Sequence, residues 1–183
     1  RLLEKPEGGA VELGGGDRFT IRRGKVEVTA GGGTGEQAPP PEPVPLNLDS
    51  GLAVFGDWTV ETTLTDESGA RAGFGDPWNA YLDNEDLLSW LIESSPGSDD
   101  PLLALRPWRA GDRIEPLGMS GSKKLQDVFT DALVPAPRRR SWPVAVIGET
   151  VIWVPGLVRS KHLLIAGPGR KVLSLRATPP FDL

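Results

Sequence analysis

The residues with the clearest chemistry lie between positions 105 and 135, in the sequence LRPWRAGDRIEPLGMSGSKKLQDVFTDALVP. Its cationic residues surround a Gly–Ser turn, and they are Arg106, Arg109, Arg113, Lys123 and Lys124. Ser122 is a good N-cap for a helix over 123–132. A helix N-terminus offers free backbone N–H groups and a positive dipole end to an anion. The stretch therefore predicts a phosphate-tracking surface and indicates nucleic-acid binding rather than a reaction centre.

More basic residues follow this stretch and widen the predicted surface. Phosphate contacts usually dominate nucleic-acid interfaces, so we predict RNA contact for the cations and for the capping serine. The predicted contact residues are Arg106, Arg109, Arg113, Ser122, Lys123, Lys124, Arg138, Arg139, Arg140, Arg159 and Lys161. Two alternatives stay open. In the first, Arg113 pairs with Asp112 or Glu115 and only holds the turn. In the second, residues 138–140 are a solvated run of charge. Asp112 itself is expected to be a turn or capping residue.

The distribution of charge supports a polyanion-binding half. The net charge of −5 would argue against nucleic acid if it were spread evenly. However, residues 1–100 hold 7 Lys and Arg against 19 Asp and Glu, whereas residues 101–176 hold 13 against 5. Such an asymmetry between halves is typical of a chain whose basic part binds a polyanion.

The composition excludes several kinds of reaction centre. There is no cysteine and only one histidine, His162, which excludes disulfides, thiolate zinc sites, cysteine nucleophiles and histidine-rich metal sites. Residues 120–123 match the Ser-x-x-Lys nucleophile pattern without its accompanying motifs, and no Gly-Lys-Ser/Thr phosphate loop is present. The acidic group of Asp83, Glu85 and Asp86 is interpreted as a turn and helix start. His162 is expected on the surface without a partner.

The longest apolar runs are also too short for a membrane span. Residues 144–147 and 151–154 fall far below the ~20 residues that a membrane-spanning helix needs. We therefore expect a soluble, intracellular protein with no membrane partner.

Turn-forming residues and periodicity predict a mainly β protein of the α+β class. Glycine and proline account for 23 and 18 of the 183 residues, whereas average usage of the two is about 12% together. The pattern predicts hairpins over 19–28, 144–154 and 163–175, strands over 52–64 and 102–108, a helix or turn within 81–92 and a loop over 66–79. Short strands joined by many turns follow from this composition.

The helix over 123–132 has one apolar face, and it is expected to end before Pro135. That face is formed by Leu125, Val128, Phe129 and Ala132. Three tryptophans and the single methionine are expected in the core, namely Trp108, Trp142, Trp153 and Met119.

The chain is expected to have three parts. Residues 1–30 form a β-hairpin segment, residues 31–47 form a Gly/Pro-rich linker, and residues 48–183 form the domain that carries the basic surface. The chain begins with Arg1 rather than methionine, so we expect it to be a fragment of a longer protein.

Four motifs, in order, resemble the C-terminal domain of bacterial tRNA(Ile)-lysidine synthetase. They are the Arg-x-Gly-Asp-Arg turn at 109–113, Pro-Leu-Gly-Met at 116–119, Ser-Lys-Lys-Leu at 122–125 and Trp-Val-Pro-Gly at 153–156. The resemblance covers residues 81–176, the family core of the domain. One departure is Leu133, where many relatives carry a basic residue, and residues 138–140 add positive charge beside it.

The resemblance implies a tRNA-binding role in a cytoplasmic enzyme. The family joins lysine to C2 of the wobble cytidine of tRNA(Ile), after ATP has adenylated the base. ATP, magnesium and L-lysine belong to an N-terminal domain with a Ser-Gly-Gly-x-Asp-Ser loop that this chain lacks. This chain is therefore expected to hold no cofactor, to be non-catalytic by itself and to engage the acceptor-stem side of tRNA(Ile). The implied fold is a small β-sandwich with a flanking helix, similar to a domain of the phenylalanyl-tRNA synthetase β subunit.

A second hypothesis comes from a different functional class. The same basic face would suit a protein-interaction or dimerisation β-domain that meets an acidic partner, including a second copy of the chain. A dimer at micromolar concentration without a preference for tRNA would favour this alternative.

Overall fold

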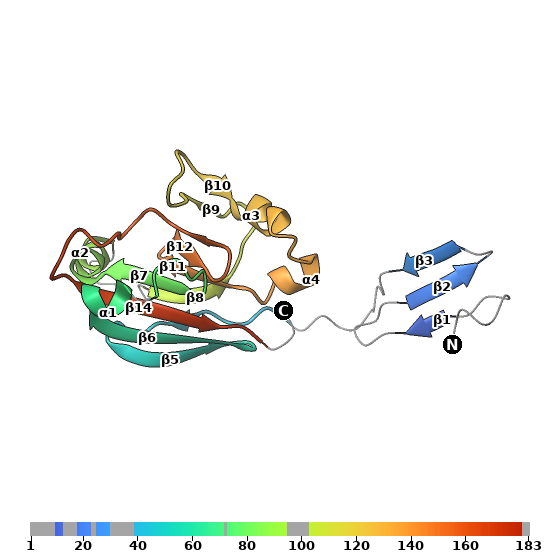
Figure 1. The fold of residues 1–183 in the computed structure, drawn as a ribbon, viewed down its shortest axis with the longest axis horizontal. Coiled ribbons are helices and arrows are strands. Elements are labelled where there is room, and N and C mark those ends of the chain that lie inside the picture. Colours follow the sequence, from blue (N-terminus) through green and yellow to red (C-terminus); the bar gives the residue numbers. More distant parts are fainter. Residues whose placement is uncertain are drawn as a thin grey trace. The chain divides into compact units, whose positions relative to one another are not determined.

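The computed structural model describes residues 39–71, 73–94 and 103–180, together with the backbone of three strands nearer the N-terminus (Figure 1). The chain divides into two compact units, Arg1–Pro39 and Pro40–Leu183. In the first unit, β1 (Ala10–Glu12), β2 (Arg18–Arg22) and β3 (Lys25–Thr29) form an antiparallel sheet in that order. The predicted hairpin over 19–28 is confirmed, with Ile21 opposite Val26.

The second unit contains two larger antiparallel sheets. The five-stranded sheet has the order β13-β12-β11-β8-β4, made of Val158–Arg159, Thr150–Val154, Pro143–Ile147, Leu103–Pro107 and Val44–Pro45. The four-stranded sheet has the order β5-β6-β14-β7, made of Ser50–Phe55, Trp58–Asp66, Lys171–Thr178 and Asn79–Asp83. A separate short hairpin pairs β9 (Arg113–Ile114) with β10 (Lys123–Lys124).

Four helices complete the described part of this unit, and all are short. They are α1 (Glu67–Arg71), α2 (Asn84–Ser94), α3 (Leu125–Asp131) and α4 (Ala136–Arg139). Strands therefore dominate, and the predicted mainly β α+β class is confirmed.

The two larger sheets share one hydrophobic core. Phe55, Val60 and Leu175 from the four-stranded sheet belong to the same buried cluster as Leu105 and Ile152 from the five-stranded sheet. Strand β6 alternates buried and exposed positions, as a strand with one wet face should. Strand β11 is buried at every position, which explains its continuous apolar sequence.

Two local predictions were wrong. Residues 163–166 form no strand, and β14 instead lies between β6 and β7, where Leu175 is opposite both Thr62 and Ala80. The partners of β14 lie about 90 residues or more away in sequence, so no turn signal marks them. The predicted loop over 66–79 contains α1, where an Asp66 carboxylate oxygen accepts a hydrogen bond from Gly69 N at 2.8 Å.

Candidate nucleic-acid interface

The basic sequence around Lys123 folds as a hairpin rather than as the start of a helix. Lys123 and Lys124 form β10, where Lys124 lies opposite Arg113 of β9. Helix α3 begins only at Leu125 and has seven residues. The predicted helix-terminal anion site is therefore wrong, because cross-strand pairing holds both lysines in extended backbone.

Ser122 does not cap α3, because it lies two residues before the N-cap position, and its hydroxyl binds Arg113 instead. The Arg113 Nε donates to Ser122 Oγ at 2.8 Å, and its Nη2 donates to the Ser122 carbonyl at 3.0 Å. Residue Lys124 takes the N-cap position, without a side-chain hydrogen bond. Arg113 stays exposed, and it braces the hairpin while part of its guanidinium still faces solvent.

Arg106 lies inside the protein, although the sequence placed it on the surface. It is 3% exposed, and its two terminal nitrogens donate to the two carboxylate oxygens of Asp112 at 2.8 and 2.9 Å. One of those oxygens also accepts from Arg109 N at 2.7 Å. Asp112 is thus the turn residue that the sequence predicted, and its partner is Arg106 rather than Arg113. A bidentate, charge-assisted pair of this kind fixes the turn that precedes β9.

The exposed cations of the hairpin differ in how far neighbouring acids neutralise them. Lys123 Nζ lies 2.6 Å from an Asp131 carboxylate oxygen at the end of α3. Arg109 lies 3.5 Å from Glu149, and both side chains are more than half exposed, so this pair is weak. Lys124 is exposed and forms no ion pair with any residue that the structure describes.

The three arginines at α4 also differ in whether other residues bind them. Arg139 Nε donates to the Val134 carbonyl at 2.9 Å, and its guanidinium lies 6.0 Å from the centre of the Phe129 ring. Arg139 therefore anchors α4 to α3. Arg138 and Arg140 are exposed, and no acidic side chain of the described residues pairs with them.

Arg159, at the end of β13, and Lys161, two residues later, lie outside the basic hairpin. Arg159 turns inward, where its Nη2 donates to the carbonyls of Tyr81 and Leu163. Lys161 pairs with Glu115 at 2.5 Å, and the hydrogen bond and charge of this ammonium lower the pKa of Glu115. His162, predicted to have no partner, lies 3.9 Å from Glu115 and edge-on to Trp90.

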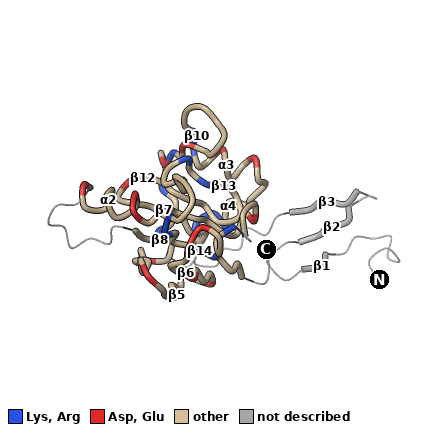
Figure 2. Tube along the Cα trace, turned by 60° about the vertical axis from the view of Figure 1, so that its left-hand side comes forward, with Lys and Arg blue, Asp and Glu red and all other residues tan. Residues whose placement is uncertain are grey.

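The exposed cations lie in the turn before β9, on β9 and β10, and at the C-terminal end of α4 (Figure 2). We call Arg109, Arg113, Lys124, Arg138 and Arg140 the basic face. Figure 2 shows Lys and Arg positions around β10, β13 and α4, with acidic positions among them as well as near β5 and β6. Such a surface, with little neutralisation from neighbouring acids, suits the spaced phosphates of a nucleic-acid backbone.

The other residues singled out in the sequence have structural roles or unexpected exposure. Trp142 and Trp153 are buried in the core, and Trp108 packs against it, as predicted. Met119 is 57% exposed, so the prediction of a core methionine was wrong, because its turn projects from the β9–β10 hairpin. Ala132 is exposed, unlike the other three members of the predicted apolar face.

The acidic group at the start of α2 is a turn and helix start, as interpreted. One Asp83 oxygen accepts from the backbone N–H groups of Glu85 and Asp86 at 3.1 and 3.2 Å. Sequence analysis missed Arg170, which binds all three carboxylates from a distant loop. Burial alone would raise the pKa of Asp83, but hydrogen bonds from Arg170 and the backbone outweigh it and lower that pKa.

The described residues show neither a metal centre nor a membrane-crossing helix. Among them, no group of three or more His, Cys, Asp or Glu side chains is placed to hold a metal ion. None of the helices that the structure describes has the length and apolar character needed to cross a bilayer.

A comparison with known families matches the part of the chain that carries the basic face. Residues 103–175, which contain the basic face, match the family model described as TilS substrate C-terminal domain. This part of the chain is similar to that family. A solved TilS C-terminal domain has the same fold, with a TM-score of 0.56 at 20% identity, over 73% of this chain and 92% of that one.

Curated relatives carry the name of the corresponding enzyme. The tRNA(Ile)-lysidine synthase of Symbiobacterium thermophilum is 54% identical over 60 residues, which is 33% of this chain and 12% of the relative. That of Geobacter sulfurreducens is 42% identical over 101 residues, which is 55% of this chain and 20% of the relative. The chain thus aligns with a fifth or less of the length of these two TilS proteins.

Proposed function

We propose that this chain is the tRNA-binding C-terminal part of a tRNA(Ile)-lysidine synthase, and that its basic face docks on the acceptor-stem side of tRNA(Ile). The observation that carries the proposal is the set of exposed cations on β9, β10 and α4, of which Lys124, Arg138 and Arg140 have no acidic partner among the described residues. The family of residues 103–175 supports the same assignment.

The chemistry of an RNA stem explains why such a face would suit it. An A-form helix has a deep, narrow major groove and a wide, shallow minor groove lined by 2′-hydroxyls. Side chains therefore recognise a stem mainly through its backbone and shape. A projecting hairpin with cations at separate positions can reach phosphates along one strand, and each contact releases counterions.

In this proposal the domain does no bond-making itself. ATP, magnesium and lysine would bind in the larger part of the enzyme, which the aligned segment does not cover in the relatives. The domain would hold the tRNA so that the wobble cytidine reaches that distant site. Binding energy used for positioning raises the rate of the reaction as well as the affinity. The likeness to a domain of the phenylalanyl-tRNA synthetase β subunit, another tRNA enzyme, belongs to the same proposal.

A salt titration tests this function directly. Affinity is measured between the 183-residue chain and a tRNA(Ile) acceptor minihelix, beside a non-cognate stem of the same length. Four to six phosphate contacts give a log–log slope of about −4 to −5. That slope with a cognate preference supports the proposal, whereas undetectable binding to both stems contradicts it.

One observation favours the second candidate, a protein-interaction surface. Leu52 and Val54 on the edge strand β5 are 67% and 57% exposed, and an exposed apolar edge strand is a template for pairing with another chain. Sedimentation velocity at micromolar concentration separates the two candidates. A stable dimer that dissociates in the Leu52→Lys variant would support this alternative.

A further inference from the structure

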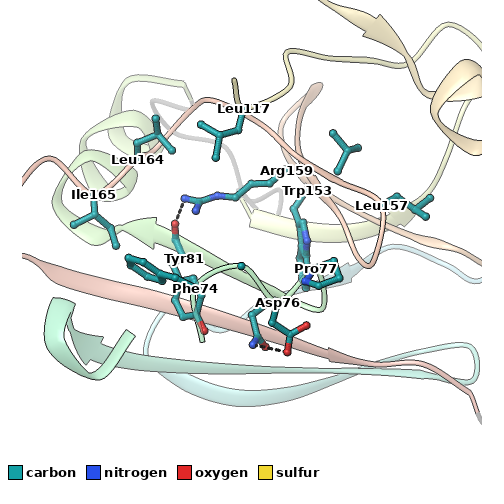
Figure 3. Close-up of a pocket in the computed structure, with 13 residues that line it drawn as sticks. Phe74, Asp76, Pro77, Tyr81, Leu117, Trp153, Leu157, Arg159, Leu164 and Ile165 are labelled. Carbon is teal, nitrogen blue, oxygen red and sulfur yellow. Dashed lines mark hydrogen bonds between the residues drawn. The ribbon is translucent and has the colours of Figure 1, made fainter. Parts of the chain in front are cut away.

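A pocket of about 480 Å³ is lined in part by the loop that joins β9 to β10, and none of the five basic-face residues lines it (Figure 3). It is formed by segments that are far apart in sequence, including the turn at 74–77, β7 and the segment 157–165. Its volume is within the range of pockets that hold small organic ligands. Figure 3 shows the Arg159 side chain between Leu117 and Leu164 on one side and Phe74 and Tyr81 on the other.

The walls of this pocket are apolar and aromatic, and much of that surface is uncovered. Phe74, Leu117 and Leu164 are 50%, 49% and 41% exposed. The Phe74 ring lies 5.0 Å from the Tyr81 ring, centre to centre. Gly73 allows this close approach, since a Cβ at that position would lie 1.9 Å from the Tyr81 hydroxyl. The turn is thereby held over Tyr81 and presents Phe74 to the pocket.

Arg159 brings an unneutralised charge into this apolar site. No carboxylate of the described residues lies within 4.0 Å of its guanidinium, and its Nε is buried without a hydrogen-bond partner. Burial lowers the pKa of Arg159, although the nearby Tyr81 opposes this effect. Asp76, the acid in the lining, already accepts hydrogen bonds from Trp78 N and Asn79 Nδ2. Nη2 of Arg159 already donates to two backbone carbonyls and Nε is buried, which leaves Nη1 as the donor available to a ligand with acceptor oxygens.

The pocket and the basic face share one loop. Leu117, on the rim of the pocket, lies in the loop that joins β9 to β10. This loop is fastened to the Arg159 segment, because Leu117 N donates to the Arg159 carbonyl and Lys161 N donates to the Glu115 carbonyl, both at 2.9 Å. Backbone hydrogen bonds thus hold the pocket to the hairpin that carries Arg113 and Lys124.

We propose that this pocket holds one unpaired nucleotide at the end of the RNA stem bound by the basic face. The base stacks against Phe74 and contacts Leu117 and Leu164, and Arg159 donates to a base carbonyl or phosphate oxygen. This inference rests on the proposed tRNA-binding function. An apolar side chain from a protein partner would fill the same walls, but it would leave Arg159 without an acceptor. A nucleotide supplies both a base to pack against the apolar walls and acceptor oxygens for Arg159.

Two minihelices with the same stem test the inference in the 183-residue chain. One is blunt, and the other carries a single-stranded 3′ extension with 2-aminopurine at one position at a time. Stacking of a base on an aromatic side chain typically changes affinity by about 5- to 150-fold. We expect the extension to tighten binding within that range and the 2-aminopurine emission to be quenched at one position.

Variants assign the effect to the pocket. Phe74→Ala, at a half-exposed position, should remove the gain from the extension and the quenching, but leave affinity for the blunt stem unchanged. Arg159→Gln should reduce the gain as well. Leu52→Ala is the matched control, because Leu52 is also an exposed apolar residue but lies on β5. It should change neither quantity.

The outcomes separate this inference from the function on which it rests. Equal affinity for both RNAs, with the steep salt dependence retained, overturns the pocket assignment and leaves the stem-docking proposal standing. A gain from the extension that survives Phe74→Ala places the nucleotide elsewhere and also overturns the inference. If neither RNA binds, the proposed function fails and this inference fails with it.

Discussion

Two sides of the same folded unit carry opposite charge. Residues 40–70, which form β4, β5, β6 and most of α1, contain six Asp and Glu and no Lys or Arg. Residues 103–143, which include the β9–β10 hairpin, α3 and α4, contain eight Lys and Arg and four Asp and Glu. Both regions contribute to one hydrophobic core. Net charge thus says little about what this protein binds, because segregation within the fold gives each side its own field.

The basic side also differs from the region around α2 in how its charges are used. On the basic side, Arg106 and Asp112 form a buried pair that shapes the turn, Lys123 and Arg139 are half-buried with partners, and the other cations face solvent. Near α2, by contrast, Arg170 gathers three carboxylates and neutralises much of a cluster that would otherwise repel an anion. The predictions below test these two uses of charge, from the largest expected effect to the smallest.

The largest effect is expected from breaking the buried pair beneath the basic face. Asp112→Ala leaves the Arg106 charge buried without a partner, and such a loss destabilises a protein by about 3–5 kcal/mol. Urea denaturation should show this decrease in the free energy of unfolding. Glu149→Ala is the control, because Glu149 pairs with Arg109 in an exposed ion pair worth less than about 1 kcal/mol. A similar, small change in both variants would contradict a structural role for the buried pair.

The next effect concerns the exposed cations themselves. The triple variant Lys124→Glu, Arg138→Glu, Arg140→Glu should weaken minihelix binding by roughly 100- to 500-fold at 0.1 M salt and make the salt slope shallower by about 3. The free energy of unfolding should stay near that of the unchanged protein, since these side chains form no ion pairs with the described residues. Lys171→Glu is the matched control on β14. Unchanged RNA affinity in the triple variant would mean that the basic face does not bind RNA.

The basic side also shows how much the sequence could reveal. The β11–β12 hairpin was predictable, because two apolar runs flank a Gly–Glu turn and pair locally. The partner of Asp112 was not, because Arg106 and Arg113 both lie within six residues of it. The choice depends on β8, which points Arg106 into the protein, and that direction is set by pairing with β11. Local patterns thus predicted the basic stretch, while long-range pairing decided which of its cations face solvent.

The pocket was beyond reach of the sequence for the same reason. Phe74, Tyr81, Leu117 and Arg159 come from separate segments, and of these four only Leu117 stands in a motif noted in the sequence, Pro-Leu-Gly-Met. Only the packing of the two sheets brings them together. The lysines of β10 illustrate a second limit, since the apolar periodicity of α3 extends the predicted helix backward over residues that pair as a strand.

A smaller effect is expected at the acidic cluster, and it depends on pH. Because the folded protein lowers the pKa of Asp83 below 3.8, the ionised carboxylate stabilises the fold above that pH. This contribution is lost as the pH falls below 3.8 and through the lower folded pKa. Asp83→Asn should therefore destabilise the protein by about 1–3 kcal/mol at pH 7, and the difference should shrink toward zero in strong acid. A difference that stays constant down to pH 2 would contradict this assignment.

The smallest effect sharpens the contrast between the two sides by adding one charge. Leu133 is 86% exposed in the turn between α3 and α4, with a left-handed backbone φ of 56°. Leu133→Lys places a cation in this turn between α3 and α4. One further phosphate contact should tighten minihelix binding by about 3- to 8-fold at 0.1 M salt and steepen the slope by about 0.9. Leu133→Gln is the uncharged control and should leave both unchanged. If the two variants bind alike, this turn lies outside the RNA contact.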